Sequence, residues 1–228
     1  MYTALLLLAF AAGDPIPKES DEARIKREWG ELADSSEKST IKLSGKKLKM
    51  TLPAGGRRPG NSRSGNDELA PYVFKTFEGN FVAQVTVHGH SAPDSAIAKP
   101  NEIITGSGLI AIFDEKTALT FCRATMPPKG EFRFYSSMRY LNGGMTSTSG
   151  PTPAAQKEST ILRLTRTTNQ LDMEYSLDEG KKWQRFTLYQ RPTNSPVKIG
   201  VYAEHTCETV TEATFSDFSL KAYDPEKK

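Results

Sequence analysis

The chain has 228 residues, with 30 basic and 27 acidic side chains and a net charge of +3. So mild an excess of positive charge argues against a nucleic-acid partner, which usually requires a strongly basic surface. The length suits either one large domain or two small ones, and no linker-like segment divides the chain. We therefore expect a single domain with a sizeable core.

The N-terminal segment is typical of a targeting signal rather than of a folded element. Residues 3–12 form an apolar run that is too short to span a bilayer, which requires about 20 residues. Small residues precede Asp14 and Pro15, as at a signal-peptidase site, although the run lacks a basic segment before it. We expect residues 1–13 to be a signal peptide and the protein to be secreted or periplasmic, without a membrane span. A buried N-terminal strand is the alternative.

Beyond this segment the pattern indicates an all-β protein. Residues 14–28 form a charged extension, and residues 21–29 are its helix candidate. After Trp29 the apolar residues recur with a period of two, and turn residues separate the runs at regular intervals. This predicts a two-sheet antiparallel β-sandwich over residues 29–223, followed by a tail at 224–228. The expected strands are 47–52, 72–77, 79–88, 108–113, 118–125, 131–140, 160–167, 171–176, 182–189, 197–205 and 213–222.

The most informative motif is Ser176-x-Asp178-x-Gly180-x-x-Trp183, which lies between two strand-like runs. Asp and Gly tolerate positive φ angles, and a short polar side chain can bind the amides of its own turn. The motif predicts a structural β-hairpin in which Ser176 and Asp178 hold the turn and Trp183 packs over the apolar face. A single copy argues against a propeller of repeated blades.

Five segments stand in the order and spacing of a known family. They are residues 70–87, 107–114, 175–183, 198–204 and 213–220. Together they resemble the regulation-of-enolase-like domain, which belongs to the concanavalin A-like lectin and glucanase superfamily. The resemblance implies a sandwich of the jelly-roll type, often found in exported bacterial proteins, and supplies no agreed catalytic residue. The hairpin departs from the family pattern because Glu179 is inserted between Asp178 and Gly180.

This resemblance favours an exported module that is not an enzyme and that recognises a polysaccharide or another protein. Two alternatives stay open, a glycoside hydrolase on the same fold and a structural envelope protein. The sequence shows no Ser–His–Asp or Cys–His arrangement and no phosphate-binding glycine loop.

Asp172 and Glu174 are the catalytic candidates of the hydrolase alternative. They are two residues apart on an expected strand, so both point to one face of the sheet. Glucanases of the resembling superfamily carry Glu-x-Asp-x-x-Glu, whereas this chain continues with Tyr175 and Ser176 and lacks the last carboxylate. A solvated polar face is the simpler interpretation, and we assign no catalytic residue.

His88 and His90 are the candidate metal ligands, because a His-x-His pair on one strand face can bind zinc. A zinc site needs a third ligand, and His205 is the only other histidine in the sequence. Calcium held by Asp94 or Asp114 is a further option. We expect no metal and no cofactor, and interpret the histidines as surface residues.

Other binding candidates are basic and aromatic. Arg57 and Arg58 lie in a glycine-rich loop that could meet an acidic glycan or simply be solvated. Tyr135 and Tyr202 could stack on a sugar ring.

The two cysteines of the chain, Cys122 and Cys207, could form one disulfide, as suits an exported protein. The bridge would close a long loop and stabilise the fold by roughly 4 kcal/mol in the chain-entropy model. Two buried free thiols are the alternative.

Overall fold

The structure is a computed structural model, and it describes most of the chain after residue 18. The described ranges are 19–33, 38–55, 70–89, 105–114, 117–126, 131–139, 145–149, 159–168, 170–190, 196–205 and 209–226, with the backbone alone at 126, 131–133, 135–139 and 145–149. The expected signal peptide therefore lies outside the described residues. In the described ranges no helix has both the length and the apolar character that crossing a membrane requires.

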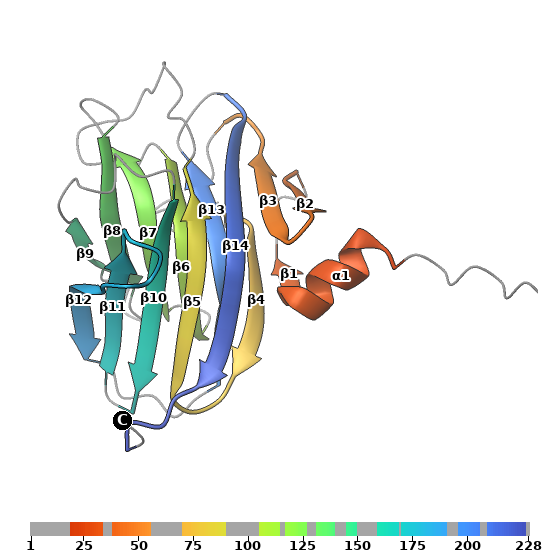
Figure 1. Cartoon of the computed structure of the whole chain (residues 1–228). Helices are drawn as coiled ribbons and strands as arrows, with labels where there is room; N and C mark the ends of the chain where they lie inside the picture. The colour runs from red at the N-terminus through yellow and green to blue at the C-terminus, as the bar shows by residue number, and fades with distance from the viewer. Residues whose placement is uncertain are drawn as a thin grey trace, which may run out of the picture.

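The described elements form two seven-stranded sheets that lie face to face, with one helix at the side (Figure 1). In chain order they are α1 (Asp21–Glu28), β1 (Glu31–Ala33), β2 (Thr40–Ser44), β3 (Lys47–Leu52), β4 (Tyr72–Phe77), β5 (Phe81–His88), β6 (Thr105–Asp114), β7 (Thr117–Met126), β8 (Glu131–Arg139), β9 (Met145–Ser149), β10 (Ser159–Thr167), β11 (Gln170–Ser176), β12 (Gln184–Gln190), β13 (Val197–His205) and β14 (Thr211–Ala222). Sheet A has the order β1-β4-β13-β6-β7-β8-β9, and sheet B has the order β12-β11-β10-β5-β14-β3-β2.

This architecture confirms the predicted fold class, because the neighbouring strands pair antiparallel in both sheets. Three short strands, β1, β2 and β9, were not predicted. β1 and β9 lack an alternating apolar pattern, and β2 has two apolar residues, Ile41 and Leu43. Such short segments become strands because a longer neighbour supplies their hydrogen-bond partners.

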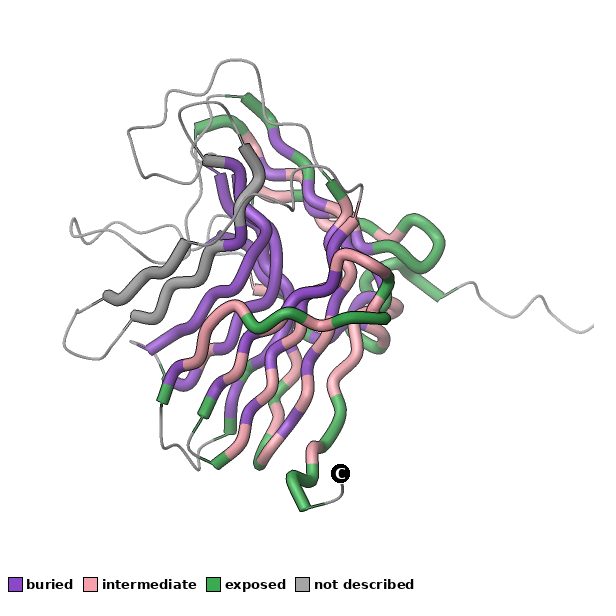
Figure 2. Tube along the Cα trace, turned by 60° about the vertical axis from the view of Figure 1, so that its left-hand side comes forward, coloured by how far each residue is buried: buried purple, intermediate pink, exposed green. Residues whose placement is uncertain are grey.

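The core lies between the sheets and follows from alternation along each strand. On β5 every second residue from Phe81 to Val87 is fully buried, and the residues between them are half-buried on the outer face of sheet B. β10 and β11 alternate in the same way, as the colours along the strands in Figure 2 show. Aromatic rings join the two sheets: Phe134 of β8 stacks on Tyr175 of β11 with ring centroids 3.9 Å apart. One face of each sheet is thus used for packing between the sheets. The outer face of sheet B is half-buried, whereas a second group of residues that includes Ile110, Cys122 and Tyr202 is buried on the outer face of sheet A.

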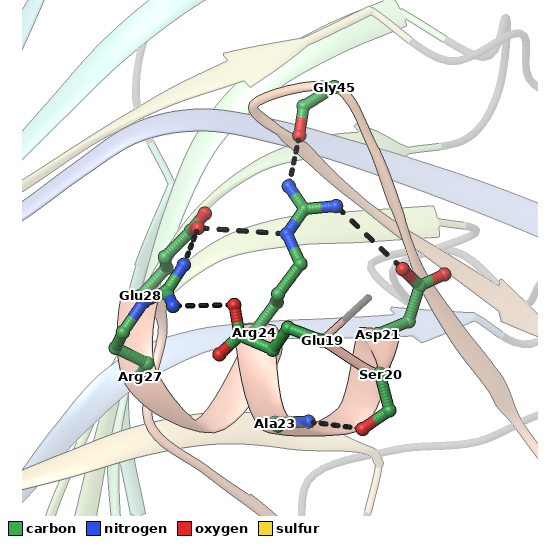
Figure 3. Close-up of polar contacts among 8 residues, drawn as sticks. All are labelled: Glu19, Ser20, Asp21, Ala23, Arg24, Arg27, Glu28 and Gly45. Carbon is green, nitrogen blue, oxygen red and sulfur yellow. Dashed lines mark hydrogen bonds and ion pairs between the residues drawn. The ribbon is translucent and has the colours of Figure 1, made fainter. Parts of the chain in front are cut away.

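The helix α1 contacts both sheets. Its residue Ile25 is buried in the core. Arg24 donates a hydrogen bond of 3.2 Å to the carbonyl oxygen of Gly45, in the turn between β2 and β3 of sheet B (Figure 3). Lys75 of β4 in sheet A donates to the carbonyl oxygen of Glu28 at 2.8 Å and so satisfies an acceptor at the end of the helix.

Two glycines allow neighbouring strands of sheet A to approach closely. At Gly200 of β13, a Cβ atom would lie 1.8 Å from the carbonyl oxygen of Val73 on β4. At Gly108 of β6, it would lie 2.1 Å from the carbonyl oxygen of Phe121 on β7. Because the opposing atoms belong to the backbone, they cannot swing aside as a flexible side chain would. Packing, rather than an unusual φ angle, requires glycine at both positions.

We expect Gly200→Ala to lower the free energy of unfolding by about 2 kcal/mol or more, because β13 and β4 must separate to admit the methyl group. Gly45→Ala is the matched control. Gly45 has a φ of 63° and open space around it, so alanine there meets backbone strain of about 1 kcal/mol and no clash. Urea denaturation compares the two variants. A Gly200→Ala protein as stable as Gly45→Ala would contradict the close approach.

Candidate functional site

The loop between β11 and β12 is held by hydrogen bonds of two short polar side chains. The Ser176 hydroxyl donates to Oδ1 of Asp178 at 2.8 Å and accepts from the amide of Gly180 at 2.9 Å. The same oxygen of Asp178 accepts from the amide of Lys182 at 2.8 Å. These bonds lower the pKa of Asp178, and the Lys182 amide is the larger cause. Glu179 and Gly180 take φ angles of 61° and 86°, so Glu179 occupies a conformation that suits glycine.

We expect Asp178→Ala to lower the melting temperature at neutral pH, because the Lys182 amide and the Ser176 hydroxyl lose their acceptor. The lowered pKa means that the carboxylate stabilises the fold above about pH 4, and that this contribution disappears as the pH falls through the folded-state pKa. Thermal melts at pH 7 and pH 3 should therefore show a difference that shrinks in acid. Glu179→Gly, which relieves the positive φ, is the control and should melt no earlier than the wild type. An equal loss at both pH values would contradict a role for the carboxylate charge.

Trp183 lies on the solvent-facing side of sheet B, which corrects the expectation that it packs over the apolar face. Its ring covers the guanidinium of Arg163, an outward-facing residue of β10, with Cζ 3.7 Å from the ring centroid. The loop crosses the outer face before β12 begins, since a Cβ at Gly180 would contact both Ile161 of β10 and the Trp183 ring. The indole is consequently half-buried, with part of its surface exposed.

Two ion pairs lie on this outer face, and one of them includes Arg163. Arg163 donates to Oε2 of Glu174 through Nε at 2.8 Å and Nη2 at 2.7 Å. Arg185 of β12 donates to Oδ2 of Asp172 at 2.6 Å. The register places Glu174 directly between Arg163 and Arg185. We call these four residues and Trp183 the Trp183 platform.

The chemistry of the platform suits binding better than hydrolysis. A glycosidase needs one protonated carboxylic acid and a second carboxylate that acts on the same bond. Asp172 and Glu174 are instead held in two separate ion pairs, each with its own arginine. The platform instead combines an accessible aromatic ring with fixed donors and acceptors, the combination found in sites for small polar ligands.

His88 lies on the same outer face, at the end of the central strand β5. Its Nε2 is 3.0 Å from the hydroxyl of Ser216, which donates to Oδ2 of Asp217 at 2.7 Å. Burial lowers the pKa of His88 below 6.5; the charge of Lys47 lowers it further, and Asp217 opposes both. Serine is the middle member of this chain of contacts, whereas histidine is central in a catalytic triad. The arrangement therefore lacks the geometry of a nucleophilic site.

The structure does not bring the predicted metal ligands together in the part of the chain that it describes. There, no three His, Cys, Asp or Glu side chains gather as a metal site would require. His205 is fully buried on β13 of sheet A, whereas His88 lies on the outer face of sheet B. His90 and Asp94 lie outside the described residues, and Asp114 is exposed at the end of β6. The expectation of no metal and no cofactor stays a prediction.

A buried polar cluster on the outer face of sheet A was not predicted. Tyr202 of β13 is fully buried and donates to Oε1 of Glu204 at 3.1 Å, so its ring is not offered to a ligand. The hydroxyl also bonds to the thiol of Cys122 on β7, which it reaches because Gly108 of the intervening strand has no side chain. Burial raises the pKa of both groups well above their ordinary values. Both remain protonated at neutral pH, and the thiol is unreactive.

We expect Tyr202→Phe to lower the free energy of unfolding by about 1–2 kcal/mol, because buried Glu204 loses a hydrogen-bond donor. Tyr175→Phe is the control, since its hydroxyl donates to Gln184, whose side chain is exposed and can bond to water instead. Urea denaturation should show the larger loss for Tyr202→Phe. Equal losses would contradict a special contribution of the buried cluster.

Arg123 of β7 is a second buried polar residue that was not predicted. It points into the interior beside its cross-strand neighbour Ser107 and is 1% exposed. Burial lowers its pKa to about 10, so the side chain keeps its charge at neutral pH. The alternation of side chains along β7 could have predicted that Arg123 faces the interior, because it lies two residues after the core residue Phe121.

Several other candidates cannot be placed. Arg57, Arg58 and Cys207 lie outside the described residues, as does the side chain of Tyr135. Cys122 is a buried free thiol, and its disulfide with Cys207 stays a prediction.

Comparison with known proteins extends the assignment of the fold. No family model and no curated protein sequence matches the chain. Among solved structures, a functionally unknown protein from Saccharomyces cerevisiae is similar with a TM-score of 0.64 and 19% identity, over 82% of this chain and 98% of that one. A legume lectin-like domain from Entamoeba histolytica has a TM-score of 0.56 and 8% identity, over 85% and 90% of the two chains. GH43B of the Bacteroides ovatus xyloglucan PUL has a TM-score of 0.55 and 17% identity, over 80% of this chain and 34% of that one.

At these identities the similarity shows the fold alone. The chain is a β-sandwich that shares its fold with a legume lectin-like domain and with part of GH43B. The narrower regulation-of-enolase-like family is not shown.

Proposed function

We propose that this protein is an exported, non-catalytic module that recognises carbohydrate through the Trp183 platform. A polysaccharide would lie across β10, β11 and β12 with one sugar ring against the indole. The observation that carries the proposal is the position of that ring, partly exposed and with its centroid 3.7 Å from Cζ of Arg163.

The platform is preorganised, which reduces the entropy that binding must overcome. Arg163 is fixed from below by Glu174 and carries the indole above it. Glu174 keeps 22% of its side-chain surface exposed, so sugar hydroxyls can donate to it, whereas Oδ1 of Asp172 is buried. Hydrogen bonds to such charged groups are stronger than those between neutral groups.

Two further observations support the proposal. The fold is shared with a legume lectin-like domain. The apolar run at residues 3–12 fits an exported protein, and the five family-like segments favour membership of the regulation-of-enolase-like family.

We expect Trp183→Ala to weaken binding of a neutral oligosaccharide by at least about tenfold, because a buried aromatic contact of this kind contributes more than 1.4 kcal/mol. A glycan array identifies the oligosaccharide, and titration calorimetry measures the affinity. Asp178→Ala is the control: it destabilises the hairpin but removes no platform side chain, so it should bind normally below its melting temperature.

Two results would overturn the proposal. Unchanged affinity of Trp183→Ala would place any carbohydrate site elsewhere. Release of reducing ends from a glycan by the wild type, abolished in Glu174→Gln, would replace recognition by glycoside hydrolysis.

A further inference from the structure

Four lysines gather on the hairpin formed by β2 and β3, at the side of sheet B far from Trp183. Lys42 of β2 lies directly opposite Lys49 of β3, so both project from the outer face. Lys47 lies two residues before Lys49 and shares that face. Lys46 is exposed in the connecting turn. We call these four residues the lysine patch.

The charge of the patch is largely uncompensated. Lys49 pairs with Glu212 of β14 at 2.7 Å. Lys42, Lys46 and Lys47 make no ion pair within the described part of the chain. Like charges directly opposite each other on paired strands destabilise a sheet, as Lys42 and Lys49 do here. A cluster with this cost is a candidate for a contact with an anionic partner.

Protection of the sheet edge explains only part of the patch. Lysines on an edge strand discourage pairing with another chain, and β2 is the edge strand of sheet B. This accounts for Lys42. Lys47 and Lys49 belong to β3, which is paired on both sides by β2 and β14. They protect no edge.

The side chains around the patch indicate what kind of anion fits. Thr214 faces Lys49, Ser44 faces Lys47, and Thr51 follows on β3. These outer-face positions carry hydroxyls, and none of them is aromatic or large and apolar. Single-stranded nucleic acids are usually held by aromatic stacking and membranes by apolar insertion. Ammonium groups interleaved with hydroxyls suit a polymer that is both anionic and rich in hydroxyls.

We propose that the lysine patch binds the carboxylate or sulfate groups of an acidic polysaccharide whose chain extends across the outer face of sheet B to the Trp183 platform. The polysaccharide class rests on the proposed function. β3 and β11 are separated by four strand spacings in the sheet order, a span of about 19 Å. A ligand must therefore be several sugars long to contact both places. The hydrogen bond from Arg24 to Gly45 fixes the hairpin turn that carries Lys46 (Figure 3).

The test compares two triple variants with equal loss of charge. Lys42→Gln/Lys46→Gln/Lys47→Gln removes the three unpaired lysines of the patch. The matched control removes three exposed positive charges outside sheet B, on α1 and β13, as Lys26→Gln/Arg27→Gln/Lys198→Gln. Calorimetry at several salt concentrations measures binding to polygalacturonate, chondroitin sulfate, a neutral oligosaccharide, a DNA duplex and phosphatidylglycerol vesicles. The melting temperature and oligomeric state of each variant are recorded in parallel.

We expect the patch variant to bind at least one of the two acidic polysaccharides about tenfold more weakly than the wild type at low salt, with a flatter salt dependence. The control variant should stay within about twofold of the wild type, because long-range charge is screened. Neutral oligosaccharide binding should be unchanged in both. For acidic oligomers too short to reach both the lysine patch and the Trp183 platform, the patch variant and the control variant should have the same affinity.

Other outcomes overturn the inference. Equal losses of affinity in both triple variants would mean that only the net charge of the protein matters. Patch-dependent binding of DNA or vesicles that is as tight as binding of the polysaccharides would indicate a different partner. Self-association of the patch variant with unchanged affinity would leave edge protection as the role of these lysines. If the wild type binds the neutral oligosaccharide but neither acidic polysaccharide, only this inference is refuted. If binding of an acidic polysaccharide depends on the patch but is unchanged in Trp183→Ala, only the role of the Trp183 platform is refuted.

Discussion

The packing of two sheets through one face each is the constraint on which the rest of the structure depends. Because side chains alternate along a strand, every residue that enters the core sends its neighbours to the outer face. The apolar odd-numbered residues of β5 therefore determine where His88 points, and those of β11 determine where Asp172 and Glu174 point. A register slip of one residue would bury these charges and expose the core, so packing also secures the geometry of the outer face.

The outer faces of the two sheets differ in how accessible their polar side chains are. The face of sheet A is closed around Tyr202 and Glu204, which are paired with each other and nearly inaccessible. The face of sheet B stays open, and its polar side chains form ladders across strands, with the tryptophan at one side and lysines at the other. Because of this asymmetry, we place the proposed recognition site on sheet B, although both faces carry aromatic residues.

Periodicity predicted the fold class, most strands and the shared face of Asp172 and Glu174, because these follow from local alternation. It could not predict that Trp183 lies outside the core, since that depends on how a loop with Glu179 at positive φ crosses the sheet. The contact of Tyr202 with Cys122 depends on β6 lying between β13 and β7, and strand order is not a local property. The lysine patch was missed for a related reason: Lys42 and Lys49 become neighbours only when β2 pairs with β3.

The close approach at Gly108 and Gly200 has a consequence for tracing ancestry. Both positions exclude a side chain for reasons of backbone geometry, so a distant homologue with the same strand pairing is obliged to keep glycine there. In sheet A, Gly108 lies opposite Tyr202 of β13, and Gly200 lies opposite Phe74 of β4. Among chains that share this strand pairing, the two positions therefore offer fixed points for aligning sequences that otherwise have little in common.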